Sequence, residues 1–370
     1  MKKIIVMPDS FKNTMDSNTV CSIIKKSLLE EEKTLNIKTY ELADGGEGTA
    51  LIFSKYLGLD IERIKTINAF GEEIEVIYGT DGKTAVIDIA SVVGFDVNVN
   101  HELDPSKAST NGIGILMRKI MEAGHDKIYV GLGGSITNDL GLGMMSELGV
   151  KFYDEDNKII NPVGSNMGII KTVDVKNQVQ FNGEIICLSD VVSPLFGENG
   201  AAKMFARQKG ASDEMIIRLE EDGKKVVKVI NNVVEECSMY PGSGAAGGLG
   251  FSFKTFYNAE MKSGIDKILL FSGIREQVDA DTIIITGEGK FDNQSMNGKV
   301  INGIVKIANE KKADVIVIAG YSEIEECEGI RKIISTIDEK KDFDYVKANC
   351  RENLYLATKK VYEYIKKRCI

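Results

Sequence analysis

The segment that most constrains the fold is residues 131–143, Gly-Leu-Gly-Gly-Ser-Ile-Thr-Asn-Asp-Leu-Gly-Leu-Gly. A short apolar run, residues 127–130, precedes it, and a helix-like run, residues 144–150, follows it. A strand, a glycine loop and a helix start present backbone N–H groups and a positive helix end to an anion such as phosphate. Asp139 adds a carboxylate suited to Mg²⁺. An ordinary turn has the same signature, so this loop alone favours neither interpretation.

Two further glycine loops follow predicted strands and contain acids. Residues 43–49 (Ala-Asp-Gly-Gly-Glu-Gly-Thr) include Asp44 and Glu47, and residues 286–295 include Glu288. Ligands of open α/β sheets bind at the carboxyl ends of the strands. We therefore expect these loops to lie at such an edge.

The first predicted strand, residues 4–7, ends at Pro8 and leads to Asp9 and Lys12. Its carboxyl end is where chemistry is expected, although a surface turn is the alternative. A fourth glycine segment, residues 241–250, either packs backbone against backbone or lies on a ligand.

Residues 203–211 form the most cationic short patch and include Arg207 and Lys209. The patch either binds a carboxylate or phosphate or is a solvated turn. Residues 73–78 and 84–89 flank Asp81-Gly82, which predicts a hairpin rather than a nucleotide loop.

The composition restricts the class of protein. The 370 residues suggest about two domains, and the net charge of −9 argues against a nucleic-acid partner. Six scattered cysteines fit a reducing compartment, and neither a signal peptide nor a membrane span is predicted. We expect a cytoplasmic protein without membrane partners; a homo-oligomer is allowed.

The chain has two histidines, His101 and His125, both in polar surroundings that predict surface positions. A Ser-His-Asp hydrolase is therefore disfavoured, and acid–base chemistry is expected from carboxylates.

Glycine loops, carboxylates and lysines fit phosphoryl transfer, which requires positioning and charge stabilisation. An NAD(P)-dependent dehydrogenase would need Gly-x-Gly-x-x-Gly after the first strand, where this chain differs. A small-anion binding or regulatory protein is the third alternative.

Six motifs occur in an order and spacing that resemble the glycerate kinase family of the bacterial glycerate 2-kinase type. They are residues 8–12, 43–49, 131–139, 208–211, 241–250 and 286–289. The resemblance implies ATP-dependent, Mg²⁺-dependent phosphorylation of D-glycerate, usually at the 2-hydroxyl. It also implies two α/β domains: one flavodoxin-like, with a parallel sheet built from both chain ends, and one inserted mixed α/β domain. We place them at residues 1–65 with 276–370, and at residues 66–275.

The resemblance suggests roles for these motifs. Asp9, Lys12 and Asp190 are the expected catalytic residues, with Asp9 or Asp190 as base or metal partner. Other groups are expected to hold ligands: for the nucleotide Gly133, Gly134, Ser135, Asn138, Gly287, Glu288 and Gly289; for the substrate Asp44, Gly45, Gly46, Glu47 and Lys209; for the metal Asp44 and Asp190.

The chain also departs from the family pattern. Asp88 stands where glutamate is usual, and Ser193 stands where asparagine is expected. A kinase for a related sugar acid therefore stays an alternative.

Overall fold

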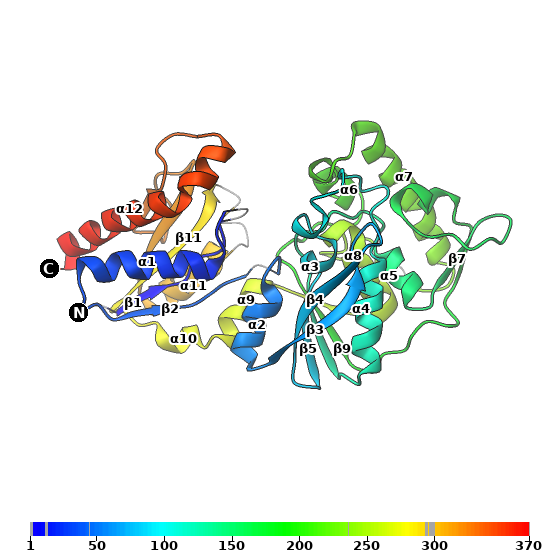
Figure 1. Ribbon diagram of the computed structural model, residues 1–370, viewed down its shortest axis with the longest axis horizontal. Helices are drawn as coiled ribbons and strands as arrows, with labels where there is room; N and C mark the ends of the chain where they lie inside the picture. Colours follow the sequence, from blue (N-terminus) through cyan, green and yellow to red (C-terminus); the bar gives the residue numbers. More distant parts are fainter. Residues whose placement is uncertain are drawn as a thin grey trace. The chain divides into compact units, whose positions relative to one another are not determined.

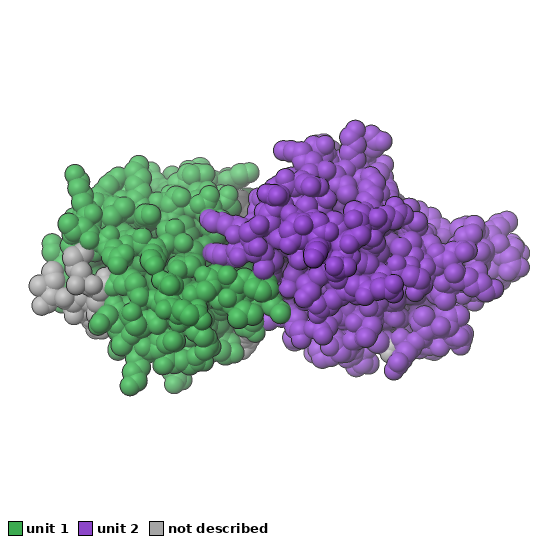
Figure 2. All heavy atoms as spheres, turned by 90° about the horizontal axis from the view of Figure 1, so that it is seen from below, with its two compact units in different colours: residues 1–44, 265–370 green, residues 45–264 purple. Residues whose placement is uncertain are grey.

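The computed structural model describes residues 3–11, 14–43, 45–235, 237–292, 295 and 300–369. The chain forms two compact units, coloured separately in Figure 2. Unit 1 comprises Met1–Asp44 and Ile265–Ile370, and unit 2 comprises Gly45–Gly264. The domain boundaries predicted from the sequence lie after residues 65 and 275, whereas the boundaries of the two units lie after residues 44 and 264.

Unit 1 contains a parallel sheet built from both ends of the chain. The strand order is β13-β12-β11-β1-β2, and each neighbouring pair is parallel. Counted along the chain, this is the order 2-1-3-4-5 of flavodoxin-like folds, so the predicted fold class is confirmed. The strands are β1 (Lys3–Val6), β2 (Ile37–Thr39), β11 (Thr282–Phe291), β12 (Asp314–Ser322) and β13 (Lys332–Ser335).

Helices cover the sheet of unit 1. On one face, α1 (Ser17–Glu31) and α12 (Phe343–Cys369) lie side by side (Figure 1). Their apolar residues form one core with alternate strand residues such as Ile4 and Ile283. The other helices among the described residues of this unit are α9 (Gly264–Phe271), α10 (Ile274–Gln277) and α11 (Val300–Lys311).

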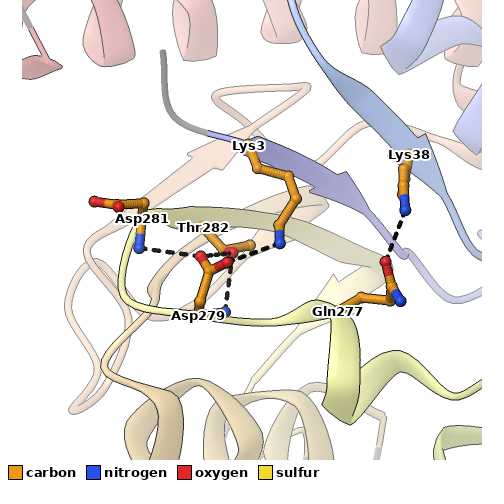
Figure 3. A network of polar contacts seen from close by, with 6 residues as sticks. All are labelled: Lys3, Lys38, Gln277, Asp279, Asp281 and Thr282. Atoms are coloured by element: carbon orange, nitrogen blue, oxygen red, sulfur yellow. Dashed lines mark hydrogen bonds and ion pairs between the residues drawn. The ribbon is translucent and has the colours of Figure 1, made fainter.

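Polar contacts connect the N-terminal ends of β1 and β11 (Figure 3). Lys3 Nζ lies 2.9 Å from Asp279 Oδ2, and Asp279 Oδ1 accepts a 2.7 Å hydrogen bond from Thr282 Oγ1. Lys38 Nζ donates to Gln277 Oε1 at 2.7 Å. The contacts of Asp279 lie at the amino ends of β1 and β11, opposite to the carboxyl ends where the site is predicted.

Unit 2 contains a mixed six-stranded sheet in the order β10-β9-β6-β5-β4-β3. Strands β10, β9, β6 and β5 are parallel to one another, and β4 is antiparallel to both of its neighbours, β5 and β3. The hairpin predicted at Asp81-Gly82 is confirmed, because it joins β4 to β5. The strands are β3 (Asp60–Ile67), β4 (Glu73–Thr80), β5 (Thr84–Asp88), β6 (Lys127–Gly131), β9 (Glu184–Leu188) and β10 (Glu260–Lys262).

Both faces of this sheet are covered. Residues of α4 (Asn111–Glu122), α5 (Leu142–Glu147) and α8 (Leu249–Tyr257) share one core with alternate residues of β5, β6 and β9. On the other face lies α2 (Thr49–Leu57), where the rings of Phe53 and Tyr129 are 6.1 Å apart.

Unit 2 also contains the 18-residue helix α7 (Asp213–Ile230) and several shorter elements. These are α3 (Ala90–Val93), α6 (Ala201–Phe205), the two-stranded sheet β7 (Lys151–Tyr153) with β8 (Thr172–Asp174), and the 3₁₀ turns η1 (Asp96–Asn98), η2 (Gly164–Ile169), η3 (Arg207–Lys209) and η4 (Ala245–Gly248). Among the described residues, no helix is both long enough and apolar enough to cross a membrane.

Candidate active site

In unit 1, the site residues from the two chain ends meet just beyond the end of β1, alongside β11, which continues past it. The backbone N–H of Asp9 donates to the carbonyl oxygen of Gly287 at 2.9 Å, and Thr286 Oγ1 donates to Met7 O at 3.0 Å. Asp9 is only 7% exposed, and its Oδ1 accepts a 2.7 Å hydrogen bond from the N–H of Ser10. In this strand order, the β1–β11 pair is the switch point at which such sheets bind ligands.

The segment that the sequence predicts as a loop after residue 285 is a continuation of β11. The strand extends to Phe291, and Gly287 and Glu288 pair with Ile318 and Ala319 of β12. A Cβ atom at Gly287 would lie 2.0 Å from Ile318 O, so glycine permits close approach of the two strands. The prediction of a loop is therefore wrong for residues 286–291, because β12 also continues and supplies backbone partners for this part of β11.

Two predicted site residues, Lys12 and Asp44, lie outside the described residues. Their proposed roles stay predictions. Glu288, in contrast, is described and half-buried, and its Oε1 atom is shielded from solvent.

In unit 2, glycines from two predicted loops interlock at the carboxyl ends of β6 and β9. The N–H of Gly133 donates to Gly45 O at 2.9 Å. A Cβ atom would lie 2.4 Å from Gly46 Cα if placed on Gly133, and 2.4 Å from Leu188 O if placed on Gly45. The absence of side chains thus allows three backbone segments to touch. Glu47, in the same loop, is exposed.

Asp88 fixes this interlocked loop to the end of β5. Its Oδ1 accepts from the N–H of Ser91 at 3.0 Å, and its Oδ2 accepts from the N–H of Ala50 in the first turn of α2 at 3.3 Å. Burial raises the pKa of Asp88, while hydrogen bonds from the backbone and from Ser91 act in the opposite direction. Asp88 therefore supplies the cap that Gly48, without a side chain, does not give to α2.

Asp139 plays a similar part for α5, and this differs from the Mg²⁺ ligand that the sequence suggests. Its Oδ1 accepts from the N–H of Gly141 at 3.1 Å. Its Oδ2 accepts from the N–H and Oγ1 of Thr110, at 2.9 and 2.7 Å, and from the N–H of Gly143 at 3.3 Å. Asp139 is fully buried, and burial raises its pKa against these hydrogen bonds. The protein's own carboxylate thus lies where a helix N-terminus would otherwise attract an external anion.

The remaining predicted residues of the first loop differ in accessibility. Gly134 is exposed and has a φ of +75°, whereas Ser135 and Asn138 are buried. Asn138 Oδ1 is enclosed and has no hydrogen-bond partner among the described residues. An enclosed amide oxygen without a partner is unusual and invites a ligand or water.

The cationic patch at residues 203–211 is largely committed to internal contacts. Lys203 and Arg207 pair with Glu198 and Asp213. Lys209 is 3% exposed, and burial lowers its pKa to about 7, while the charge of Asp139 acts against this.

The fourth glycine segment, residues 241–250, packs backbone against backbone, as the first of its two interpretations predicts. A Cβ atom on Gly247 would lie 2.0 Å from Thr137 O, and one on Gly244 would lie 2.2 Å from Pro194 O. These contacts hold the loop that contains Asn138.

Asp190 follows the end of β9, one residue after Ser189. The residue is half-buried, and both of its carboxylate oxygens are shielded from solvent. Within the described part of the chain, no group of three or more His, Cys, Asp or Glu side chains is arranged to hold a metal ion.

Neither histidine lies among these groups. The expected surface position is wrong for His125, which is 6% exposed and makes ring-nitrogen contacts to Thr80 Oγ1 at 2.7 Å and Ile120 O at 2.9 Å. His101 is half-buried; it stacks on Phe70 and pairs with Glu72. Both histidines have structural contacts.

Sequence reasoning missed the structural importance of Asp88. Two signals were available in the sequence: Asp88 is a carboxylate at the end of the strand β5, and the helix α2 starts after Gly48, which has no side chain to cap it. Its partner loop is distant in sequence, so only the fold identifies the contact.

The flavodoxin-like sheet and the second α/β sheet both have carboxylates and glycines at their strand ends, and these groups fit the class of phosphotransferases, whose reaction requires positioning and charge stabilisation. The chain belongs to the glycerate kinase family, whose model matches residues 4–366. The resemblance seen in the motifs is confirmed, and the dehydrogenase and regulatory-protein alternatives are set aside.

Individual relatives agree with this assignment. The chain is 34% identical to the glycerate 2-kinase of Escherichia coli (strain K12) over 324 residues, covering 86% of this chain and 85% of that protein. It is 32% identical to the glycerate kinase of Bacillus subtilis (strain 168) over 327 residues, covering 86% and 85%. A crystal structure described as a candidate glycerate kinase 2 from Salmonella typhimurium LT2 superposes with a TM-score of 0.80 at 30% identity, covering 99% and 98% of the two chains.

Proposed function

We propose that this enzyme transfers the terminal phosphoryl group of ATP to the 2-hydroxyl group of glycerate, with Mg²⁺ as the metal. The observation that carries the proposal is the set of oxygen donors at the strand ends, above all Asp9 beside Gly287 at the β1–β11 switch point. Relatives named glycerate kinase and glycerate 2-kinase support the choice of acceptor.

Asp9 is the group we favour as general base for the acceptor hydroxyl. Its backbone is held by Gly287 O and its Oδ1 by the N–H of Ser10, so the carboxyl group has a fixed direction. A positioned carboxylate accepts the hydroxyl proton as the phosphoryl group is transferred. Asp190 is the alternative base and the proposed metal partner.

The remaining groups hold the two substrates. In the first loop we assign the nucleotide phosphates to exposed Gly134 and its neighbours Gly133, Ser135 and Asn138, and on β11 to Gly287, Glu288 and Gly289. Lys12 would neutralise developing charge on the phosphoryl group. The acid would be held by Gly45, Gly46, Glu47 and Asp44.

The donor set fits Mg²⁺, which prefers oxygen ligands and usually binds through one or two carboxylates together with phosphates and water. Asp44 and Asp190 would hold the ion. Bound Mg²⁺ would neutralise charge on the phosphates.

The test is ATP consumption with a panel of hydroxy acids that includes both enantiomers of glycerate and several sugar acids. NMR of the product distinguishes phosphate on the 2-oxygen from phosphate on the 3-oxygen. We expect turnover of D-glycerate to the 2-phosphate, with loss of activity on EDTA treatment and recovery with Mg²⁺. Turnover of only a sugar acid, or of no acid in the panel, would refute the proposed substrate.

A further inference from the structure

The most informative group without an established role is the buried side chain of Lys209 at the end of η3. Its Nζ donates to Thr137 O at 2.7 Å and lies 3.4 Å from Ser135 Oγ. Ser135 is directly followed along the chain by Ile136 and preceded by exposed Gly134. The ammonium group therefore lies beneath the loop whose tip is accessible to a ligand.

The local fold directs this lysine inward. Gly210 has a φ of +95°, and a Cβ atom there would lie 2.0 Å from Leu103 O. Glycine thus allows the chain to turn sharply against residue 103 immediately after Lys209. On the far side of the ammonium, Ser135 Oγ lies 3.0 Å from Thr137 Oγ1 and 3.4 Å from Ala246 O. Lys209 therefore joins η3 to the first glycine loop, and Ser135 joins that loop to η4.

Burying the ammonium group of Lys209 is unfavourable compared with burying an apolar side chain of the same size. Removing such a charge from water is strongly unfavourable, and a methionine would occupy similar volume without that penalty. Asp139 is the charged group that acts on Lys209. The packed segments 135–137 and 245–248 have no titratable side chain, Glu102 beside Leu103 is exposed, and Asp104 pairs with Lys107.

We propose that Lys209 is a positioning residue for nucleotide binding: its ammonium group holds Thr137 O and Ser135 Oγ so that Gly134 is presented to the phosphates. This inference rests on the proposed kinase function and assigns Lys209 a place behind the loop instead of direct contact with the acid. Asp139 already occupies the nearby N-terminus of α5, so that helix end is not available to the phosphates. The phosphates are instead bound by the loop at Gly134, whose backbone is held by the ammonium group of Lys209.

This role makes nucleotide affinity depend on the protonation of Lys209. The charged form makes the stronger hydrogen bond to Thr137 O. Burial lowers the pKa of Lys209 to about 7, so the free enzyme loses this charge as the pH rises above neutrality. ADP affinity is therefore expected to fall between pH 6.5 and pH 8.5.

The experiment is calorimetric titration of the folded enzyme with ADP at these two pH values. Wild type should bind ADP about tenfold more tightly at the lower pH, the factor that corresponds to weakening one charge-assisted hydrogen bond. Lys209→Met should bind weakly at both pH values and show only the intrinsic pH dependence of ADP. Lys209→Arg, which keeps its charge throughout, should lose the decrease above neutrality.

The matched control is Lys228→Met on α7, where the lysine is exposed; it should keep the wild-type profile. A folded Lys209→Met protein that binds ADP with wild-type affinity and pH dependence would overturn the inference. If neither variant folds, a wild-type affinity that follows only the titration of ADP overturns it equally. Failure of the kinase proposal looks different, because wild type would then consume no ATP with any acid or bind no ADP.

Discussion

The carboxylate of Asp88 at the end of β5 accepts a hydrogen bond from the backbone N–H of Ala50 at 3.3 Å, across 38 positions of the chain. This contact connects a glycine loop to the sheet on which it lies. Because Asp88 is 5% exposed and also accepts from the N–H of Ser91, it holds two loops of the candidate site at once. The loop at residues 45–49 is thereby fixed at both of its ends: through Gly45 to Gly133, and through Ala50 to Asp88.

Asp88→Asn should weaken this connection. One amide N–H₂ group would replace an acceptor oxygen and face a backbone N–H, so we expect a loss of about 1–3 kcal/mol in the free energy of unfolding. If loop 45–49 holds the acid, KM for the acid should rise more than kcat falls. Chemical denaturation and steady-state kinetics check these two effects.

Asp81→Asn is the control, because Asp81 accepts backbone hydrogen bonds from Lys83 and Thr84 in the exposed β4–β5 hairpin. Its amide oxygen can still accept there, and we expect a change below about 0.5 kcal/mol with unchanged kinetics. Equal effects of the two substitutions would contradict the special role of Asp88.

Asp9→Asn should reduce kcat by about 10²–10⁴-fold, the range for loss of a general base, with little change in melting temperature. The control is Asp279→Asn at the opposite end of the same sheet, where the carboxylate pairs with Lys3 (Figure 3). That substitution should lower stability slightly and leave kcat unaltered. A wild-type kcat for Asp9→Asn would move the base to Asp190 or elsewhere.

Most helices and strands were predictable because apolar runs and glycines mark them in the sequence, whereas the prediction of the flavodoxin-like fold came from the resemblance of the motifs to a known family. The hairpin at Asp81-Gly82 and the helix beginning at Ser17 follow from local signals: a turn dipeptide, and Asp16 as a cap that accepts from the N–H of Thr19. The extension of β11 to Phe291 was not predictable in the same way. Its glycines resemble a loop, and only the neighbouring β12 makes them a strand.

The candidate site shows the same division. Sequence motifs identified the loops that contain Gly45 and Gly133, which the structure brings together. They did not reveal that Asp139 is consumed as an internal cap or that Lys209 is buried, because both facts depend on which segments pack above them. A motif therefore locates the backbone of a site more reliably than the direction of its side chains.

The pH dependence of stability should also report on Lys209. Its pKa is about 7 in the folded protein against an ordinary value of 10.5, so above neutrality the unfolded state binds more protons than the folded state. The contribution of Lys209 to stability is therefore least favourable below pH 7 and improves as the pH rises toward 10.5.

Chemical denaturation of wild type and Lys209→Met at pH 6.5 and pH 9 isolates this contribution, because other groups titrate in both proteins. At pH 6.5 the free energy of unfolding of Lys209→Met should be higher relative to that of wild type than it is at pH 9. A constant difference between the two proteins would show that Lys209 has an ordinary pKa or that Asp139 titrates with it.

Gly287→Ala tests whether close strand approach explains the glycines of β11. The added Cβ would lie 2.0 Å from Ile318 O, an atom of the neighbouring strand backbone, so β11 and β12 would have to separate. We expect a loss above about 3 kcal/mol, at the upper end for overpacking, and a lowered melting temperature. Gly58→Ala is the comparison: its φ is +69°, but no atom lies within 4 Å of the added Cβ, so only the backbone penalty of about 1–2 kcal/mol applies.

If both variants have the same melting temperature, the two strands are farther apart than the structure has them. Glycine at position 287 is then explained by contact with the phosphates alone. If Gly287→Ala is the less stable, glycine is needed there for the sheet itself, and its presence in the motif carries less information about ligand contact than its sequence context suggests.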